Sequence, residues 1–550
     1  MKLNGAEIVV ECLKEQKVKH IFGYPGAATI NIYDELYKNE EYIQHILTSH
    51  EQGAAHAADG YARSTGKVGV CLATSGPGAT NLVTGVATAY MDSVPMVAIT
   101  GNVQVDMLGK DSFQEVDIQG ITMPVTKHNF MVKDINQLAD TIRDAFYIAK
   151  SGRPGPVLVD IPKNLTWEKT EFEFTEPKEY IPKTNIIVGD TIYEMIEKSV
   201  RPMILAGGGV IRSGANKELV EFAEKLDAQV SCTLMGIGSM PYSHPQYMGN
   251  IGMHGSLVSN RAINEADLLI VAGARFSDRV VGEPSGFAAN AKIIHIDIDL
   301  AEINKNVVVD ASINGDIKVV FRELIRKINQ KENKPWTDYV NELRATVGHK
   351  TNATTVNVPM LLKEIAEYTT DDSIVATDVG QHQMWTAQHF PFEKPNRFLT
   401  SGGLGTMGYG LGAAMGAQFA NPDEKVIMIT GDGSFRMNFN EMITAVKHKL
   451  PIKIFIMNNR ALGMVRQWQN LFYENRFSST TLEEDMDYVM FAKSLGGVGF
   501  NISSLEDIKP VLDQVFATDK PVIVNCLVEQ GSNVFPMVPP GKSIFEAISE

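Results

Sequence analysis

An aspartate between two glycines, followed by a pair of asparagines, is the strongest chemical signal in the sequence. Gly431-Asp432-Gly433-Ser434 follows the apolar run Val426–Thr430, and Asn458-Asn459 stands 27 residues after the first glycine. Glycines at a strand end let the backbone approach a phosphate, and a helix N-terminus favours an anion. One carboxylate and one amide oxygen, completed by diphosphate oxygens, suit Mg²⁺. The spacing therefore favours a magnesium–diphosphate site, although the first segment alone is equally compatible with a turn that binds nothing.

These residues stand at the ends of short Val/Ile-rich runs that alternate with longer helical patterns. Apolar strands bounded by Gly and Pro, with helices between them, are typical of parallel sheets covered on both faces. We expect strands at Val68–Ala73, Met96–Thr100, Val157–Ile161, Met203–Ala206, Leu268–Ala272, Ile293–Ile296, Ile374–Thr377, Val426–Thr430, Ile452–Met457 and Val522–Leu527. The polar stretches Trp167–Asn185 and Lys327–Asn357 are interpreted as linkers. The sequence therefore predicts an α/β fold of three doubly wound parallel-sheet domains, at 1–165, 190–325 and 355–550.

The first and third domains match one another at a constant offset. Ser75-Gly76-Pro77-Gly78 falls on Gly431-Asp432-Gly433-Ser434, Pro95 falls on Pro451, and Asn102 falls on Asn458. Such internal similarity indicates a duplicated domain. The alternative is that any two doubly wound domains have Gly, Pro and Asn at such positions. Duplication predicts a ligand held between two related domains.

Composition narrows the class of protein. The 550 residues are 44% hydrophobic with a net charge of -15, and such an acidic chain repels nucleic acid and anionic lipid. The four cysteines are far apart, so a zinc site or a disulfide framework is not expected. The N-terminus has no signal or transit character, and no apolar run reaches the length of a membrane span. We therefore expect a cytoplasmic globular protein.

The GDG-and-NN pattern resembles the cofactor motif of thiamine diphosphate-dependent enzymes. In that superfamily Asp432, Asn459 and the backbone carbonyl of Ala461 would hold Mg²⁺. Ser49-His50-Glu51-Gln52-Gly53 resembles the segment of the catalytic glutamate, which implies that Glu51 bonds N1′ of the cofactor's aminopyrimidine. Gly405-Thr406-Met407 resembles the segment whose bulky side chain holds the cofactor bent. By the duplication offset Met407 is the counterpart of Glu51, so the two are expected to face one another across the cofactor.

Longer segments resemble the catalytic large subunit of acetohydroxyacid synthase, also called acetolactate synthase. They include Val379–Trp385, Ser401–Gly405, Gly463–Gln469, Ser112–Glu115 and a C-terminal lid, Asn533–Gly541. The resemblance implies a set of residues that contact thiamine diphosphate: Glu51, Val379, Gly380, Gln381, His382, Gly405, Met407, Gly431, Asp432, Gly433, Ser434, Asn459, Ala461, Gly463 and Met464.

The same resemblance assigns a flavin and a substrate site. The middle domain is similar to the family's FAD domain, which implies FAD contacts at Arg153, Gly207, Gly208, Gly209, Gly252, His254, Arg275, Asp297 and Asp316. The glycine triplet alone is as often a tight turn. For the substrate the resemblance implies Phe113, Arg279, Met464, Val465 and Trp468, with Arg279 near the carboxylate.

The activity implied is decarboxylation of pyruvate on thiamine diphosphate and condensation of the hydroxyethyl carbanion with a second 2-oxo acid. The products would be 2-acetolactate from pyruvate and 2-aceto-2-hydroxybutanoate from 2-oxobutanoate, at the first common step towards valine, leucine and isoleucine. Glu51 of one chain is expected to meet Asp432 of its partner, which makes the smallest active unit a dimer. A regulatory domain is expected to be a separate small subunit.

Rival functions and departures from the family pattern remain. A pyruvate oxidase-type enzyme with thiamine and FAD is the near alternative, and a flavin-free acetolactate synthase is a second. The family usually has Gly-Gln-Val-Pro where Gly101-Asn102-Val103-Gln104 stands, Asp where Ser277 stands and Pro where Gly412 stands. The first of these lies at the expected substrate entrance, so it leaves inhibitor sensitivity open and does not affect the reaction class.

Overall fold

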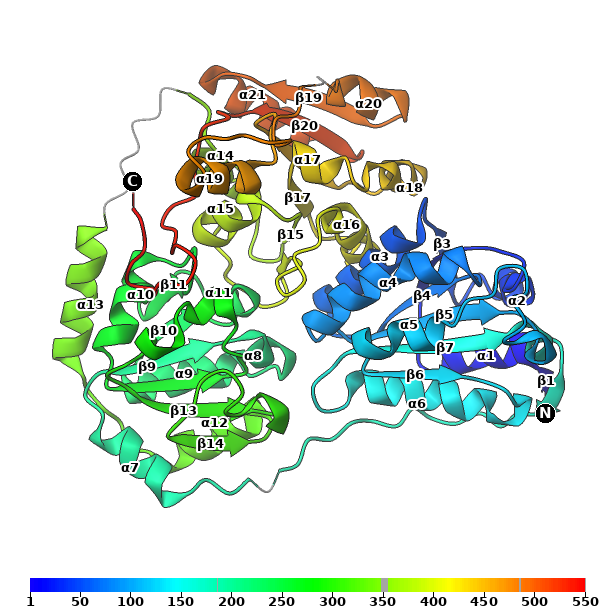
Figure 1. Cartoon of the computed structure of the whole chain (residues 1–550), viewed down its shortest axis with the longest axis horizontal. Helices are drawn as coiled ribbons and strands as arrows, with labels where there is room; N and C mark the ends of the chain where they lie inside the picture. The colour runs from blue at the N-terminus through cyan, green and yellow to red at the C-terminus, as the bar shows by residue number, and fades with distance from the viewer. Residues whose placement is uncertain (185, 348–354, 484–485, 550) are drawn as a thin grey trace.

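Three six-stranded parallel sheets form the framework of the computed structural model, which describes residues 1–184, 186–347, 355–483 and 486–549 (Figure 1). The N-terminal sheet has the order β3 (Gln44–Leu47), β2 (His20–Tyr24), β4 (Gly69–Ala73), β5 (Met96–Asn102), β7 (Pro156–Pro162) and β6 (His128–Met131). Its helices are α1 (Gly5–Glu15), α2 (Ile30–Lys38), α3 (Glu51–Thr65), α4 (Pro77–Met91), α5 (Ile118–Thr122) and α6 (Leu138–Lys150). The central strands are fully buried, as continuous apolar runs between two helical layers require.

The middle sheet has a different strand order. It runs β11 (Tyr247–Asn250), β10 (Gln229–Cys232), β9 (Pro202–Ala206), β12 (Leu268–Ala272), β13 (Lys292–Asp297) and β14 (Ala311–Asn314). Its helices are α7 (Asp190–Lys198), α8 (Gly208–Arg212), α9 (Asn216–Leu226), α10 (Leu257–Glu265), α11 (Asp278–Val281) and α12 (Ile317–Lys327). The order reverses beside β9, and ligands in such sheets bind at the carboxyl ends of the strands next to this point.

The C-terminal sheet repeats the topology of the first. Its order is β16 (Phe398–Leu399), β15 (Ile374–Thr377), β17 (Val426–Gly431), β18 (Lys453–Asn458), β20 (Val522–Leu527) and β19 (Val498–Ile502). Its helices are α14 (Val358–Ala366), α15 (Gln381–His389), α16 (Tyr409–Ala420), α17 (Asp432–Phe435), α18 (Met442–Lys447), α19 (Gly463–Phe472), α20 (Tyr488–Ser494) and α21 (Leu505–Phe516). The two sheets correspond strand for strand, as the predicted duplication requires.

One of the two predicted linkers contains a helix that belongs to the middle domain. Within Lys327–Asn357 the structure has α13 (Lys334–Thr346), whose Trp336 is 2% exposed and donates its indole N–H to the carbonyl of Pro202. The Lys/Glu/Asn-rich start of this stretch led to the prediction of a linker. The helix is stabilised by burial of Trp336 and Val340. Residues 348–354 of this predicted linker, and Asn185 of the other, lie outside the described residues. In Trp167–Asn185 the strand β8 (Lys169–Glu171) pairs with β1 (Lys2–Asn4).

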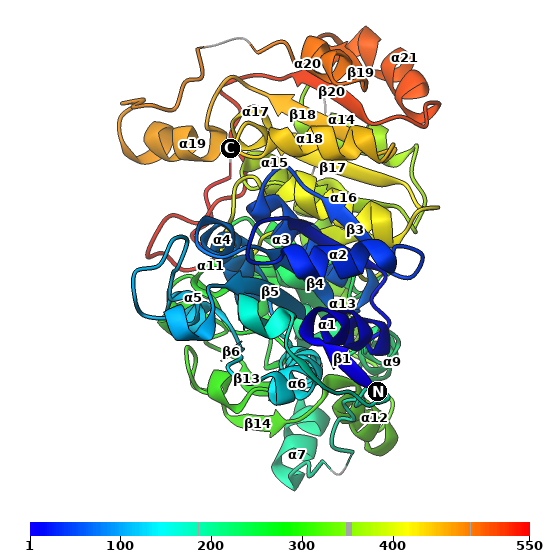
Figure 2. The ribbon, with the colours of Figure 1, turned by 90° about the vertical axis from the view of Figure 1, so that its right-hand side faces the viewer.

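Helices α3 and α16, the counterparts in the two related domains, join those domains in one chain. Both views place them against one another between the two sheets (Figures 1 and 2). A Cβ on Gly416 would lie 1.8 Å from the carbonyl oxygen of Ala57, and one on Gly60 would lie 2.1 Å from that of Ala413. Only glycine permits this approach, so two small-residue faces fix the distance between the domains.

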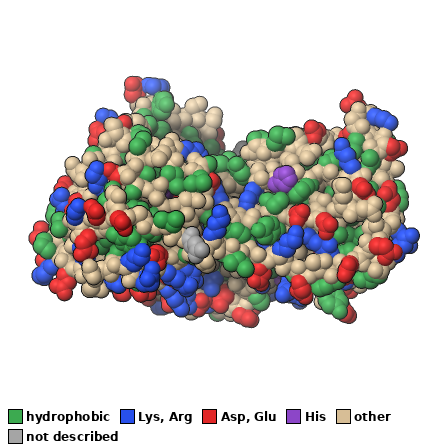
Figure 3. Space-filling model, turned by 90° about the horizontal axis from the view of Figure 1, so that it is seen from below, with side chains coloured by type: hydrophobic (Ala, Val, Ile, Leu, Met, Phe, Trp, Pro, Cys, Tyr) green, Lys and Arg blue, Asp and Glu red, His purple; other side chains and the backbone are tan. Residues whose placement is uncertain are grey.

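The molecular surface is mixed in charge on the face that Figure 3 shows. Lys and Arg side chains lie there among Asp and Glu side chains, with small groups of hydrophobic residues between them. Within the described ranges, no helix combines the length and the apolar character that crossing a membrane needs.

Candidate thiamine diphosphate site

A pocket opens at the carboxyl ends of β15, β17 and β18. It is lined by nearly all of the residues predicted for thiamine diphosphate: Val379, Gly380, Gln381, His382, Met407, Gly431, Asp432, Gly433, Ser434, Asn459, Ala461, Gly463 and Met464. Gly405 is not among the lining residues, but it lies beside Val379 with a positive φ of 69°. Three strand ends therefore bring together segments that are far apart in the sequence.

The residues predicted to bind the metal all line this pocket. Asp432 is 1% exposed, and its Oδ1 atom has no hydrogen-bond partner among the described residues. Burial raises the pKa of this carboxyl to about 6. Asn459 accepts the backbone N–H of Ala461 on its Oδ1 at 3.0 Å. A buried carboxylate oxygen without a hydrogen-bond partner and a nearby amide oxygen are ligands that suit a hard divalent cation. The described residues contain no cluster of three or more His, Cys, Asp or Glu side chains that could hold a metal ion by themselves.

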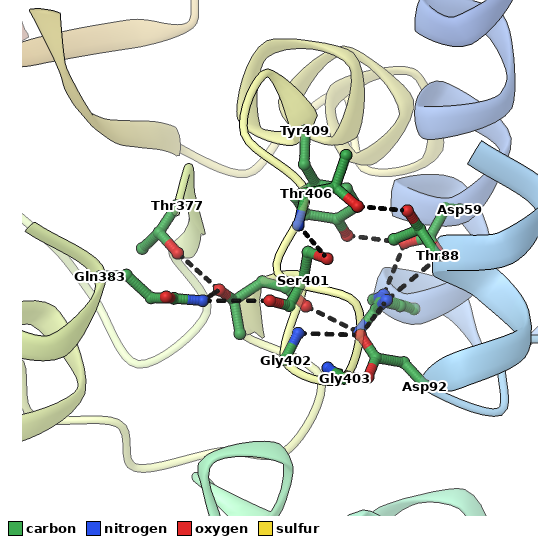
Figure 4. A network of polar contacts seen from close by, with 12 residues as sticks. Asp59, Thr88, Asp92, Thr377, Gln383, Ser401, Gly402, Gly403, Thr406 and Tyr409 are labelled. Atoms are coloured by element: carbon green, nitrogen blue, oxygen red, sulfur yellow. Dashed lines mark hydrogen bonds and ion pairs between the residues drawn. The ribbon is translucent and has the colours of Figure 1, made fainter. Parts of the chain in front are cut away.

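A buried charge network holds the loop that precedes Met407 (Figure 4). Arg63 on α3 donates from Nε to Asp59 at 2.5 Å and from Nη2 to Asp92 at 2.9 Å. Tyr409 donates its hydroxyl to the same Asp59 at 2.6 Å. The side chain of Arg63 is 3% exposed and those of both aspartates are 0% exposed. In this dry environment each charge depends on its partners, so the network is rigid.

The network reaches the backbone of the loop itself. Asp92 accepts the N–H groups of Gly402 and Gly403 at 3.0 and 2.7 Å, and Arg63 donates to the carbonyl of Thr400 at 2.9 Å. Further along, the hydroxyls of Thr406 and Thr88 lie 2.7 Å apart. The N-terminal domain therefore positions the segment that carries Gly405 and Met407 into the pocket.

Glu51 lies outside this pocket. It is the first residue of α3, and its Oε2 accepts a hydrogen bond from Asn81 at 3.0 Å. The start of α3 is held by a residue of the C-terminal domain, since the carboxylate of Glu441 accepts the N–H groups of Ser49 and His50 at 2.9 to 3.0 Å. All of the lining residues that the structure describes belong to 357–532, so within one chain Glu51 does not join Asp432.

Gln381 lines the pocket, but its side chain is bonded to protein. Its Nε2 donates to Gln467 at 2.9 Å and to the carbonyl of Ser532 at 2.8 Å, and its Oε1 accepts from Asn459 at 3.3 Å. A primary amide has two donor hydrogens, so both are in use. The side chain of Gln381 thus connects separate segments of the site.

The residues predicted for FAD gather mainly at the carboxyl edge of the middle sheet. Gly207, Gly252, Arg275 and Asp316 follow β9, β11, β12 and β14 respectively, and Asp297 is the last residue of β13. Burial lowers the pKa of His254 to about 4 and raises that of Asp297 to about 6.

Three details limit what these residues offer to a ligand. A Cβ on Gly207 would lie 2.1 Å from the carbonyl oxygen of Gly273, and one on Gly209 would lie 2.7 Å from the Cα of Gly273. Packing alone therefore requires both glycines. Arg153 forms ion pairs with Asp299 and Glu302 at 3.1 and 2.8 Å, which join the first domain to the middle one. Asp316 accepts the N–H of Val319 as the N-cap of α12.

The five residues predicted for substrate are not all brought together within the chain. Met464 and Val465, on α19, line the pocket. Trp468 of the same helix packs edge to face on Phe472, with ring centroids 5.5 Å apart. Phe113 is 87% exposed on a loop of the first domain, and Arg279 on α11 is exposed beside Asp278.

Sequence reasoning missed three residues that organise the site. Gln467 and Ser532 bond to Gln381, and Glu441 holds the start of α3. Glu441 follows Asp432 by nine residues, but nothing in the local pattern separates it from a solvated helix carboxylate. Its signal is the contact between domains, which exists only in the folded chain.

Comparison with protein families gives three matches in succession. The N-terminal domain model of the thiamine pyrophosphate enzymes matches residues 3–121, the central domain model matches 190–324, and the C-terminal domain model matches 378–526. Both outer models are described as domains that bind thiamine pyrophosphate, the other name of thiamine diphosphate. Most of the residues that line the pocket at β15, β17 and β18 lie within the third match.

Curated relatives match the whole length of the chain. The large subunit of acetolactate synthase isozyme 2 of Escherichia coli strain K12 is 44% identical over 554 residues, with 100% of both chains covered. A probable acetolactate synthase large subunit of Methanocaldococcus jannaschii is 45% identical and the acetolactate synthase large subunit of Corynebacterium glutamicum is 44% identical; each match covers 98% of this chain. They cover 94% and 89% of those relatives. The chain belongs to the thiamine pyrophosphate enzymes and, among them, to the family of acetolactate synthase large subunits.

Proposed function

We propose that the protein is the catalytic subunit of an acetolactate synthase, which converts two pyruvate molecules into 2-acetolactate and CO₂. The observation that carries this proposal is the full-length identity of 44–45% to relatives of that name, combined with a pocket lined by the predicted cofactor residues. The step belongs to the biosynthesis of branched-chain amino acids.

Thiamine diphosphate and Mg²⁺ fit the pocket of the C-terminal domain. When bound, the cofactor supplies the electron sink for decarboxylation of a 2-oxo acid. The unpaired Oδ1 of Asp432 and the amide oxygen of Asn459 would hold the cation, with the carbonyl of Ala461 as a further ligand. Met407 would support the cofactor's bent form from the loop that the Arg63 network holds.

The active unit is proposed to be a homodimer in which Glu51 of one chain completes the pocket of the other. Its support is that the lining residues in the described chain all belong to 357–532, while Glu51 stands at the start of α3 in the first domain. Glu51 would then hold a proton at the aminopyrimidine and favour the imino tautomer.

FAD is proposed to bind at the carboxyl edge of the middle sheet as a structural group. Support comes from the position of Gly252, Arg275, Asp297 and Asp316 at that edge, beside the reversal of strand order. The net reaction moves no electrons to an acceptor, so turnover would leave the flavin oxidised. A pyruvate oxidase would reduce it, and this difference separates the two activities.

We also propose 2-oxobutanoate as a second acceptor, a small regulatory subunit as partner, and the cytoplasm as location. The residues proposed to contact the acceptor are Met464, Val465 and Trp468, which all belong to helix α19. The four free cysteines are all buried, and burial raises the thiol pKa of each, which suits a reducing compartment.

The test is an assay of the purified protein with pyruvate, thiamine diphosphate, Mg²⁺ and FAD. The expected result is one CO₂ released per acetolactate formed, with the flavin spectrum unchanged during turnover. Reduction of the flavin with little acetolactate would contradict the proposal and favour the oxidase. Omission of FAD followed by a non-reducible flavin analogue tests its structural role, since the analogue should restore the rate.

A further inference from the structure

Helix α19 carries three of the residues proposed for substrate, yet its buried side chain is polar. Gln467 is 1% exposed and is the buried residue of this helix. The N–H of Val534 donates to its Oε1 at 2.8 Å, and its Nε2 donates to the carbonyl of Val534 at 3.0 Å. This two-way bond resembles one rung of a β-ladder. It fastens α19 to the C-terminal segment 532–538.

A second glutamine continues the connection into the pocket. Gln381, 4% exposed at the start of α15, donates to the same Oε1 of Gln467 at 2.9 Å and to the carbonyl of Ser532. Its Oε1 in turn accepts from Nδ2 of Asn459. Three buried amides therefore form an unbroken chain from the backbone of Val534 to the residue proposed as a metal ligand.

The chain of amides has a defined direction. A backbone N–H can only donate and a backbone carbonyl can only accept, so Val534 determines which end of Gln467 is oxygen. That oxygen requires Gln381 to present its NH₂ group, which leaves the Gln381 oxygen facing Asn459. Asn459 must then present its own NH₂ group to Gln381, and its Oδ1 is left for Ala461 and the pocket.

The packing around the last link is equally specific. A Cβ on Gly463 would lie 2.2 Å from Oε1 of Gln381 and 2.7 Å from Nδ2 of Asn459. The first residue of α19 therefore sits directly on the Gln381–Asn459 bond, and any larger residue there would have to displace these two amide groups. The helix contacts the amide chain at this end as well as through Gln467.

We propose that Gln467 and Gln381 are positioning residues that couple docking of α19 and segment 532–538 to the orientation of the Asn459 oxygen towards the cation. The inference rests on the magnesium site of the proposed function. When the C-terminal segment is docked, the amide oxygen of Asn459 points into the pocket and the cation is held. When it is undocked, this constraint on Asn459 is lost. By reciprocity, cation binding must favour docking by the same factor.

The experiment uses the full chain and two readouts that do not depend on turnover. Hydrogen–deuterium exchange is followed in peptides covering 532–538, with and without MgCl₂ and thiamine diphosphate. The Mg²⁺ affinity is measured by tryptophan fluorescence in the presence of thiamine diphosphate. Gln467→Met keeps the size of the side chain and removes its bonds to Val534. Gln469→Met is the matched control, because Gln469 is on the same helix but bonds to Ser478 and Thr480 instead.

In the unaltered protein Mg²⁺ and cofactor should slow exchange in 532–538. Gln467→Met should abolish this slowing and weaken Mg²⁺ binding by about tenfold, a typical size for coupling between sites, whereas Gln469→Met should change neither. Gln381→Glu, which cannot donate to Gln467 or Ser532, should reproduce the effect from the other end and serves if Gln467→Met does not fold.

Two outcomes overturn the proposal. One is a Mg²⁺ affinity within twofold of the control in folded Gln467→Met or Gln381→Glu. The other is exchange in 532–538 that is insensitive to Mg²⁺ in the unaltered protein although the cation binds. Either result leaves acetolactate formation by the unaltered enzyme untouched, so failure of the amide chain is distinct from failure of the proposed function.

Discussion

Replacing Arg63 by methionine tests whether the buried charge network of Figure 4 holds the two related domains together. Methionine fills much of the same space but leaves the carboxylates of Asp59 and Asp92 buried without their shared cation. Removing one partner of a buried ion pair costs about 3–5 kcal/mol, because the other charge stays desolvated. The lost bond to the carbonyl of Thr400 adds to this cost. We therefore expect Arg63→Met to lose about 3–5 kcal/mol of stability.

The comparison that identifies charge as the cause is the triple variant Arg63→Met, Asp59→Asn, Asp92→Asn. Neutral amides retain much of the shape and still accept from Tyr409 and from one of the two loop N–H groups that Asp92 binds, so the triple variant should recover more than half of the loss. Arg326→Met is the control for arginine removal, since its ion pair with Glu323 is at the surface and worth less than about 1 kcal/mol.

The assay is urea unfolding followed by tryptophan fluorescence. A chain of three domains does not unfold in one two-state step, so the quantity compared is the free energy of the first transition in matched variants. A loss below about 1 kcal/mol in Arg63→Met, or a triple variant no more stable than the single one, would refute the reasoning. The charge network would then not be what stabilises the contact between the two domains.

Four further predictions follow from other parts of the molecule. Burial raises the pKa of Asp160 from 3.8 to about 7; the folded state then binds more protons, so stability should fall by about 3 kcal/mol as pH rises from 4 to 7, and urea titrations of Asp160→Asn should lack this decline. Gly416→Val should prevent close packing of α3 on α16, seen as insoluble or separately unfolding domains, because even a Cβ would lie 1.8 Å from a carbonyl oxygen. Glu51→Gln should leave Mg²⁺ binding intact and greatly slow hydrogen–deuterium exchange at the cofactor C2; an unchanged rate would remove Glu51 from the mechanism. Trp468→Leu should still form acetolactate but lose most of a preference for 2-oxobutanoate, which one methylene limits to about 10–200-fold; a competition assay in which the product ratio stays constant would assign Trp468 to packing on Phe472.

The central strands could be predicted because burial on both faces leaves an apolar run in the sequence. The predicted strands at 203–206 and 426–430 match β9 and β17, and their ends differ from the observed ends by at most one residue. Edge strands such as β16, with two residues, carry too few side chains to show a pattern. Helix α13 was taken for a linker because its exposed positions are polar or charged, although the spacing of Trp336, Val340, Leu343 and Val347 is that of an amphipathic helix.

The candidate site divides in a similar way. Asp432 and Asn459 were predictable because strand ends and glycines are local features of the sequence. Gln467 and Glu441 were not, since each acts through a contact with a segment far away along the chain. The place of Gln381 in the pocket agrees with the local pattern, whereas the bonds of its amide to Gln467, Ser532 and Asn459 could not be predicted for the same reason.

The glycine-mediated contact between α3 and α16 also has a consequence for biosynthesis. Helix α3 ends at Thr65 and α16 begins at Tyr409, and ribosomes add about 5–20 residues per second. The alanine and glycine face of α3 therefore leaves the ribosome about 20–70 s before the helix that covers it. During that interval the nascent first domain presents an unpaired helix face, which chaperones or α16 of a neighbouring chain can occupy. The same close fit that joins the finished domains makes their assembly wait until α16 has left the ribosome.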